Sequence, residues 1–350
     1  MRIFLDDSNL HDLFYPLTTL RSFKELRTGF FSFQDRWSRI AEMKQLSIEW
    51  VHDKVNADAI IPANKIPTTS IDINSLLESN FLEQNDFITI SHLTDLIKTN
   101  ATLIVSDLSL IDKVKFLHHH QFVQHIGDHP LYIHEKAIIE HCFINTNDGP
   151  VIIDEHAHIM SGAMLRGPLY IGEHSVVKMG AQLYSGSNIG KHCVVGGEIK
   201  NTIFDSFSNK AHHGYIGDSY IGSWCNLGAG TTGSNVKNTA GDIRIWDNAQ
   251  QQYIKGPKKA GVFMGDHVKT AINTQFNSGT VVSSCVNIYS QSSKPTPKFI
   301  PMFSWGIDDD TLYKLDNLLD EINRWMKMKG QQLTELDKKN ITSIYKTHVK

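Results

Sequence analysis

Polar side chains of types that could bind a substrate and move a proton gather between residues 195 and 235. They are Lys200, Lys210, His212, Tyr215, Asn226 and Asn235. A lysine such as Lys200 can hold a phosphate, and amide and phenol groups can hydrogen-bond sugar hydroxyls. An amine nucleophile also needs a base, because an ammonium group has no free electron pair. Alone, the set is a weak signal: an outward histidine is more often a surface residue than a catalyst, and the lysines and asparagines could equally be solvated edges and corners.

The element that must position these side chains is predicted from residues 153–195, where every sixth residue is aliphatic. The series is Ile153, Ile159, Leu165, Ile171, Val177, Leu183, Ile189 and Val195. Neither an α-helix nor an alternating strand has this spacing, whereas each flat side of a parallel β-helix coil does. Successive turns stack about 4.8 Å apart, so the aliphatic residues form inner columns. The outward side chains of neighbouring coils, including the six polar residues, could then converge.

Small residues recur between the aliphatic positions, at residues 161–163, 180–181 and 185–187, as tight corners with positive φ require. The alternative is a sandwich of ordinary strands, with turn signals about every eight to twelve residues and apolar positions alternating by two. The six-residue rhythm favours the coil. It slips after Val195 and returns at residues 216–227 and 262–286, so we expect loops to leave the coil at the slips.

Composition sets limits on the partners. The 350 residues are enough for two domains, and the net charge of −3 at pH 7 provides no basic field for nucleic acid or an anionic membrane. The four cysteines, which form no CxxC pair, favour reduced thiols. The first residues become acidic too early for a signal peptide, and no apolar run approaches about 20 residues. We therefore expect a cytoplasmic protein without a membrane-spanning segment.

The first 130 residues predict a small α/β unit. Strands are expected at residues 2–5, 59–61, 87–90 and 103–105, and helices at residues 34–43 and 110–122. The run His118–His120, with His125 and His129 nearby, raises the possibility of a metal site. Adjacent histidines on a helix point to different faces, however, and no acid or cysteine has a matching spacing, so a solvated helix end is the better interpretation and no metal is expected.

The C-terminal residues predict a helical cap. Three prolines between residues 295 and 301 should end the strand ladder. An apolar stripe from Leu312 to Met326 predicts a helix, with acids 308–310 at its start and Gly330 as its stop. A second, weaker helix is expected at residues 332–346. These helices should lie on the coil or on a neighbouring subunit.

The second half of the sequence resembles a known family. Residues 200–235 are similar to the C-terminal left-handed β-helix of the bifunctional N-acetylglucosamine-1-phosphate uridylyltransferase/glucosamine-1-phosphate acetyltransferase. The pattern is closer still to shorter GlmU-like sugar nucleotidyltransferase proteins of Bacteroidetes, and it covers about residues 150–306 and, more loosely, the first 40. The matching runs are residues 160–163, 178–181, 196–200, 208–212, 226–231, 264–267, 273–274, 276–277 and 303–306.

The resemblance implies roles for individual residues. His212 takes the place of the general base that deprotonates the sugar amine, with His213 as the near alternative. Lys200 takes the place of the phosphate-binding lysine, and the sugar-contacting residues fall on Tyr215, Asn226 and Asn235. The family also implies a homotrimer, with acetyl-CoA between coils and the thioester oxyanion held by a backbone N–H.

Several positions depart from the family. Tyr184 stands where the acetyltransferase has an arginine for the sugar phosphate, and Val236 stands where it has a tyrosine. Loss of a bidentate phosphate clamp weakens the case for a sugar 1-phosphate and admits another amino sugar or a nucleotide sugar. In the N-terminal unit, residues 6–12 hold acids and no glycine, unlike a phosphate-binding loop. The basic residues that could still bind an anion, or form a solvated helix face, are Arg21, Lys24 and Arg27.

The resulting fold class is α+β with several domains. We expect a reduced nucleotidyltransferase-like domain at 1–130, a linker at 131–150, a left-handed parallel β-helix acyltransferase domain at 151–294 and helices at 295–350. The leading hypothesis is an acetyl-CoA-dependent acetyltransferase acting on an amino sugar phosphate or nucleotide sugar. The second is a sugar-1-phosphate nucleotidyltransferase using Mg²⁺ with UTP or dTTP, alone or beside the first activity. The third is a non-catalytic scaffold.

Overall fold

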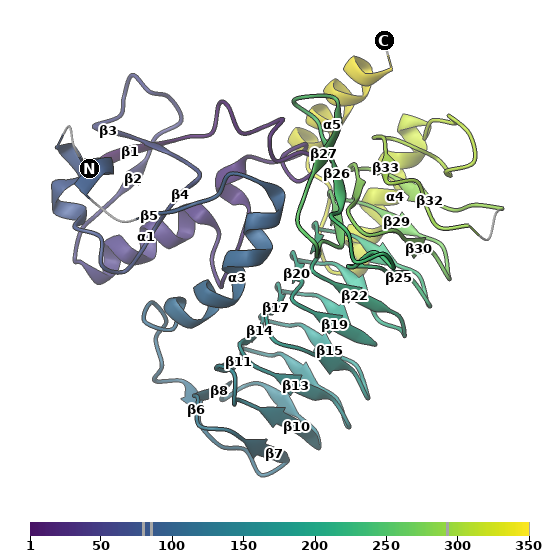
Figure 1. Ribbon diagram of the computed structural model, residues 1–350. Helices are drawn as coiled ribbons and strands as arrows, with labels where there is room; N and C mark the ends of the chain where they lie inside the picture. Colours follow the sequence, from purple (N-terminus) through teal and green to yellow (C-terminus); the bar gives the residue numbers. More distant parts are fainter. Residues whose placement is uncertain (79–80, 85–86, 292–293, 350) are drawn as a thin grey trace.

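From residue 116 onward most of the chain winds into a parallel β-helix whose three flat sides are ladders of short strands (Figure 1). The computed structural model describes residues 1–78, 81–84, 87–291 and 294–349. The six-stranded face consists of β7 (Val123–Ile126), β10 (Cys142–Asn145), β13 (Met164–Arg166), β16 (Gln182–Leu183), β19 (Glu198–Lys200) and β22 (Tyr215–Gly217).

The other two sides are longer. The ten-stranded face consists of β6 (Phe116–Leu117), β8 (Leu131–His134), β11 (Val151–Ile153), β14 (Leu169–Ile171), β17 (Ser187–Ile189), β20 (Ile203–Phe204), β23 (Tyr220–Ile221), β28 (Val262–Met264), β31 (Thr280–Val282) and β33 (Phe299–Ile300). The eight-stranded face consists of β9 (Ile138–Ile139), β12 (His158–Ile159), β15 (Val176–Val177), β18 (Val194–Val195), β21 (Asn209–Lys210), β24 (Asn226–Leu227), β29 (Lys269–Thr270) and β32 (Asn287–Ile288). β25 (Thr232–Gly233) pairs with β30 (Gln275–Phe276).

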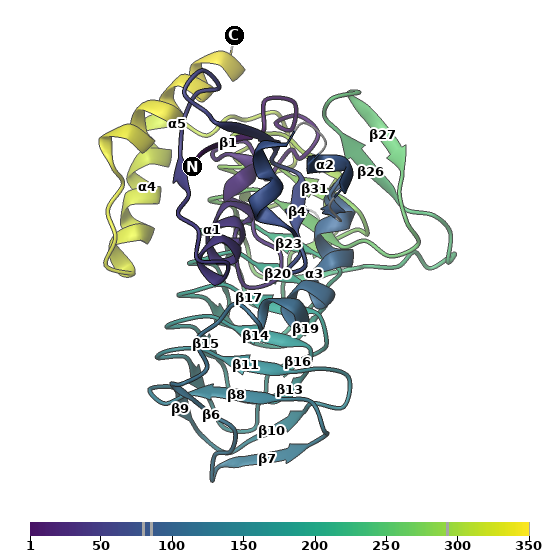
Figure 2. The same ribbon diagram turned by 90° about the vertical axis from the view of Figure 1, so that its left-hand side faces the viewer.

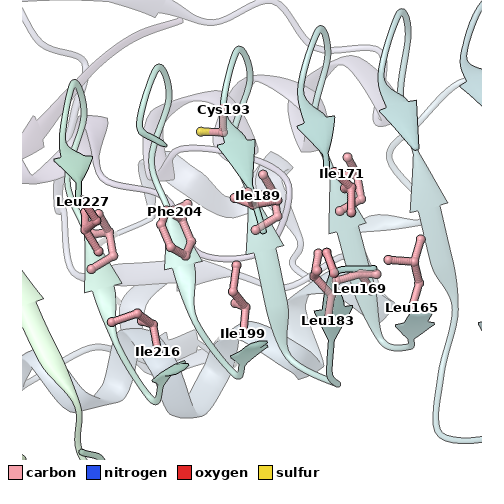
Figure 3. Close-up of a cluster of buried hydrophobic side chains, with 14 of the residues drawn as sticks. Leu165, Leu169, Ile171, Leu183, Ile189, Cys193, Ile199, Phe204, Ile216 and Leu227 are labelled. Atoms are coloured by element: carbon pink, nitrogen blue, oxygen red, sulfur yellow. The ribbon is translucent and has the colours of Figure 1, made fainter. Parts of the chain in front are cut away.

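The six-residue rhythm forms the core of the coil, which confirms the predicted left-handed β-helix. The eight aliphatic residues of the series are all at most 2% exposed. Ile153 lies in register with Ile171, and Leu165 lies in register with Leu183, so each residue stacks on its equivalent one turn away (Figure 3). Burying such a side chain contributes about 1.5–3 kcal/mol, and the stacked columns repeat that gain at every turn.

The corners between the ten-stranded and eight-stranded faces are built from rings instead of small residues. His156, His174 and His192 have φ values of 55–57° and stack with ring centroids 4.8 Å apart. Phe207 continues the stack on His192, also at 4.8 Å. Side chains at positive φ are unfavourable, and the stacking of equivalent rings offsets part of that strain.

The coil begins earlier and ends later than the sequence predicted. Residues 131–150, expected to be a linker, form β8, β9 and β10, because Ile133 and Ile144 continue the aliphatic columns. The proline-rich stretch contributes β33, which pairs with β31. There Val281 and Ser283 donate to the carbonyls of Lys298 and Ile300, so the ladder needs no N–H from a proline. The division into separate domains stays a prediction.

The two slips in the rhythm have different causes. A hairpin of β26 (Arg244–Asp247) and β27 (Gln252–Lys255) leaves the coil after β25, and Ala260 returns by donating to Asn235 O. This slip is a loop, as expected. After Val195 no loop leaves the coil. There the corner is shortened, because only residues 196 and 197 separate β18 from β19.

The N-terminal unit has a parallel sheet in the order β2-β1-β3, formed by β1 (Arg2–Asp6), β2 (Glu49–Trp50) and β3 (Ala59–Pro62). Its other elements are η1 (Phe23–Glu25), α1 (Phe33–Met43), β4 (Lys65–Pro67), η2 (Ile73–Leu77), α2 (Phe81–Gln84), β5 (Phe87–Thr89) and α3 (Leu93–Asp107). Two predictions here are wrong. Residues 103–105 belong to α3, whose buried Leu96, Ile97, Leu103 and Ile104 follow helical spacing, and residues 110–122 contain β6 instead of a helix.

The histidine run also differs from the prediction, since it lies on the turn between β6 and β7 and not at a helix end. His118 Nδ1 lies 3.1 Å from Leu131 O. Within the described residues, no group of three or more histidines, cysteines or acids is arranged to hold a metal ion. The four cysteines are free and buried.

Each end of the chain covers a different face of the coil (Figures 1 and 2). The N-terminal unit packs on the ten-stranded face, whose outward Ile203, Tyr220 and Phe263 join its core. Helix α4 (Leu315–Met328) lies on the eight-stranded face, where its Trp325 covers Lys269, and α5 (Glu335–His348) packs against α4 and places Tyr345 on Phe303. By contrast, the six-stranded face exposes apolar side chains, which are Ile126, Phe143 and Met164.

The C-terminal helices match the two predicted ones, with one difference. Acids 308–310 precede α4 instead of capping its first turn, and Asp308 accepts hydrogen bonds from Ser290 and Gln291. Gly330 follows α4 with a φ of 72°, as a helix stop requires. In the part of the chain that the structure describes, no helix is long and apolar enough to cross a membrane.

Candidate functional site

His212 lies on a corner of the coil, between β21 of the eight-stranded face and β22 of the six-stranded face. Residues 211–214 form this corner, and the side chains of His212 and His213 are both exposed. The His212 imidazole therefore points away from the aliphatic columns and is open to a reactant. The order of the residues explains this: Lys210 takes the inward position at the end of β21, and Ile216 takes the next one on β22.

Tyr215 and Lys200 lie side by side on the six-stranded face. In the ladder, β19 pairs with β22 so that Lys200 is in register with Gly217. The Tyr215 ring extends along its own strand, since a Cβ on Gly217 would lie 2.0 Å from the Tyr215 hydroxyl. Glycine at position 217 thus makes room for the phenol. Lys200 is exposed, so its ammonium group is free to meet an anion on this face.

Asn235 holds the far end of the Tyr215 ring. Burial raises the pKa of the Tyr215 hydroxyl to about 12, assisted by Asp218 and Glu198, while a hydrogen bond with Asn235 acts in the opposite direction. Tyr215 is therefore a neutral donor or acceptor at neutral pH. Lys200, Tyr215 and Asn235 form one polar group at the end of β22 opposite to His212.

Asp218 organises this polar group, and the sequence reasoning missed it. Its carboxylate is 9% exposed and accepts from Asn201 Nδ2 at 2.6 Å and from Asn235 Nδ2 at 2.5 Å. The signal was present in the spacing, because Asn201, Asp218 and Asn235 fall at equal intervals along the chain. They occupy equivalent positions on three successive coils, with Asn201 and Asp218 at positive φ.

Asn226 lies apart from these residues. It is on β24 of the eight-stranded face, where its Oδ1 accepts from Asn209 Nδ2 at 3.4 Å. The adjacent Asn209 also accepts from Lys329 Nζ at the end of α4, at 2.8 Å. Within one chain, the structure does not bring Asn226 to the polar group around Tyr215.

Lys210 is the one residue of the six whose predicted outward direction is wrong. Its side chain is 1% exposed and points into the coil. It replaces an aliphatic residue in the inner column and therefore cannot contact a bound substrate from the outside.

The basic residues of the N-terminal unit are mostly engaged in packing. Arg21 pairs with Asp205 at 2.6 Å and with Asp266 at 2.7 Å, and both carboxylates belong to the coil. Arg27 is buried and donates to Phe30 O at 3.1 Å and Asn188 Oδ1 at 3.2 Å. Lys24 is half-buried. Arg21 and Arg27 thus join the unit to the coil, an arrangement that does not favour anion binding; that role stays a prediction.

Comparison with known proteins adds the family context. No family model matches the chain. A bifunctional sugar-1-phosphate nucleotidylyltransferase/acetyltransferase of Sulfurisphaera tokodaii is 28% identical over 269 residues, which cover 72% of this chain and 65% of the relative. Bifunctional GlmU proteins of Methanocaldococcus jannaschii and Methanococcus aeolicus are each 34% identical over 87 residues, 25% of this chain and 21% of theirs. The chain is thus similar to GlmU-like proteins. It spans less than two thirds of the length of these relatives.

The chain departs from the acetyltransferase pattern of the family at Tyr184 and Val236, and both residues lie close to the polar group of Lys200, Tyr215 and Asn235. Tyr184 is near enough to Tyr215 to affect its pKa, and it lines a groove of about 620 Å³ on the six-stranded face. Arg166 also lines the groove, but it pairs with Asp148 at 2.6 Å. Val236 is exposed beside Asn235. The region next to Lys200 is therefore more apolar than an arginine clamp would make it.

Proposed function

We propose that this GlmU-like chain transfers an acetyl group from acetyl-CoA to the amine of an amino sugar phosphate or nucleotide sugar, with His212 as the general base. The observation that carries the proposal is the placement of an exposed imidazole at one end of β22 and of a lysine, phenol and amide group at its other end. Both ends lie on a β-helix similar to curated proteins named as acetyltransferases.

The proposed chemistry uses each group for one task. His212 takes a proton from the sugar ammonium, which frees the electron pair that attacks the thioester carbonyl carbon. The C–S bond then breaks, the attacking nitrogen loses its second proton, and the thiolate takes up a proton from the imidazolium of His212, so that CoA leaves as the thiol and the second proton passes to solvent. Lys200 would pair with a phosphate of the acceptor, and Tyr215 and Asn235 would hydrogen-bond its hydroxyls. A backbone N–H would stabilise the oxyanion.

We further propose that the chain works as a homotrimer with acetyl-CoA between coils. Ile126 and Phe143 are 59% and 50% exposed on the six-stranded face, as suits a surface that another copy covers. A neighbouring copy could also bring its own eight-stranded face, with Asn226, to the polar group of the first. Sedimentation equilibrium should give three times the mass of one chain; a monomer would exclude this arrangement.

Acetyl-CoA consumption across amino sugars, their phosphates and nucleotide sugars tests the activity. The proposal predicts CoA release with at least one phosphate-bearing acceptor and little with the free sugars, since Lys200 needs an anionic partner. Calorimetric titration with CoA measures binding of the acetyl donor independently of the acceptor that is chosen. No release across the panel together with no heat of binding at micromolar CoA would indicate a non-catalytic scaffold.

A second candidate is sugar-1-phosphate nucleotidyl transfer with Mg²⁺ and UTP or dTTP. The observation in its favour is the name of the Sulfurisphaera relative, which includes this activity, because its alignment covers 72% of the chain. Against it, the loop after β1 carries Asp7 and Asp12 and no glycine, and the carboxylate of Asp6 pairs with Lys54 at 2.8 Å. Release of pyrophosphate from UTP or dTTP with sugar phosphates would support this activity, and its absence would remove it.

A further inference from the structure

A lysine occupies a position of the inner column where the neighbouring coils have aliphatic residues. In the eight-stranded ladder Lys210 is in register with Val195 of the preceding coil, and Leu227 ends the equivalent strand of the next coil. Both are buried, as is Lys210 at 1% exposure. Taking an ammonium group out of water is unfavourable unless it finds strong partners. A lysine retained there therefore needs a specific explanation.

The partners of Lys210 are two main-chain carbonyls on neighbouring corners. Its Nζ donates to Gly196 O at 3.0 Å and to His212 O at 2.8 Å. No carboxylate contributes to the shift of its pKa, which burial alone lowers to about 8. The ammonium group thus ties the corner that carries His212 to the corner of the preceding coil.

The shortened corner at residues 196–197 makes this tie possible. Residues 211–214 form the corresponding corner of the next coil, and their backbone comes close to Gly197. A Cβ on Gly197 would lie 2.8 Å from both His212 O and Gly214 O and 2.9 Å from Lys210 Nζ. With the carbonyl of His212 held inward by Lys210, its side chain is held on the outside, where it is exposed.

We propose that Lys210 is a positioning residue for His212. It fixes the backbone of the 211–214 corner through the His212 carbonyl and so aims the imidazole at the acceptor amine, without touching either substrate. This inference rests on the proposed function, in which His212 is the base. It assigns a role in the reaction to a side chain that the outward motif residues do not include.

A double-mutant cycle tests whether Lys210 acts through His212. Lys210→Met keeps most of the length of the unbranched side chain and removes its hydrogen-bond donors. We expect it to lower kcat by roughly 10- to 100-fold, as for a base that is misplaced, with the KM for acetyl-CoA within about twofold. In a His212→Ala background the same change should have no further effect, because residues that act as a unit are not additive. A further fall in the double mutant would show a merely structural role and overturn the inference.

Lys298→Met is the matched control. Lys298 Nζ also donates to two main-chain carbonyls, Ser278 O at 2.9 Å and Arg244 O at 3.4 Å, but near the β26–β27 hairpin and away from His212. Its loss should leave kcat within about twofold of the wild type. If Lys210→Met proves insoluble, Gly197→Ala is the second variant, because its Cβ would crowd the carbonyls of His212 and Gly214. It should likewise lower kcat and leave the KM for acetyl-CoA within about twofold.

Amide hydrogen exchange separates this inference from the proposed function. The amides of residues 211–214 should exchange faster in Lys210→Met than in Lys298→Met, whatever the activity of the protein. If His212→Ala keeps full activity while this exchange still rises, the general-base proposal fails and the anchoring of the corner stands. Unchanged exchange and unchanged kcat in Lys210→Met would overturn the anchoring itself.

Discussion

At the scale of single residues, Lys210 makes the stability of the coil depend on pH. Its pKa is about 8 in the folded chain against 10.5 for an ordinary lysine. Between these values the unfolded chain binds the proton and the folded chain does not, so the free energy of unfolding rises with pH across this window. Below pH 8 the full penalty of the buried ammonium is present. Each pKa unit corresponds to about 1.4 kcal/mol, which makes the whole effect about 3 kcal/mol.

Chemical denaturation of the wild type and Lys210→Met at pH 7.5 and pH 10 would measure this contribution. We expect the stability of the wild type, relative to the variant, to be higher at pH 10 than at pH 7.5. Other titrating groups cancel in the comparison because both proteins share them. A difference between the two proteins that is the same at both pH values would contradict the lowered pKa of Lys210.

Residue types in the candidate site could be read from the sequence, but their directions could not. The outward positions of His212, Tyr215 and Lys200 follow from the aliphatic rhythm on either side of them. Lys210 breaks that rhythm, and only the shortened corner at residues 196–197 shows that a lysine can turn inward there and find two carbonyls. Asp218 was missed because it acts on Asn235 and not on a substrate.

At the scale of elements, Arg21 is the main ionic link between the N-terminal unit and the coil. Its side chain is 15% exposed and pairs with Asp205 and Asp266, which are 7% and 8% exposed. Removing one partner of a buried pair leaves the other charge uncompensated, at a cost of about 3–5 kcal/mol. We expect Arg21→Ala to lower the free energy of unfolding by this amount in denaturant titrations.

Arg39 provides the comparison for that prediction. It pairs with Glu42 at 3.4 Å on the surface of α1, and both side chains are more than half exposed. Exposed pairs of this kind contribute about 0–1 kcal/mol, so Arg39→Ala should have little effect. Equal losses in the two variants would mean that Arg21 does not hold the N-terminal unit on the coil.

The sequence predicts some elements better than others for a physical reason. In the coil each turn repeats the same inner positions, so a six-residue period marks the strands even where they are two residues long. In the N-terminal unit each element packs differently, and the run Leu103–Ile104–Val105 looks like a strand until the spacing of Leu96 and Ile97 is included. Prolines near β33 were misleading because the ladder there uses carbonyls next to them.

At the scale of the whole molecule, the two ends of the chain cover two faces of the coil, and the candidate site lies on the third, six-stranded face. The N-terminal unit packs on the ten-stranded face, and α4 lies on the eight-stranded face (Figures 1 and 2). His212 precedes β22, the hydroxyl of Tyr215 reaches the opposite end of this strand on the six-stranded side, and Asn226 lies on the eight-stranded face. Two neighbouring copies could bring Asn226 of one chain to the polar group around Tyr215 of the other, which one chain alone does not do. This agrees with the proposed homotrimer.

The most direct test of the central claim compares His212→Ala with His213→Ala in steady-state acetyl transfer. The two histidines are adjacent on one exposed corner, so both changes should perturb the fold equally little. If His212 is the base, its loss should lower kcat by about 10²–10⁴-fold, as for a positioned proton acceptor, and the loss of His213 should change it by less than about tenfold. An undiminished rate in His212→Ala would contradict the account.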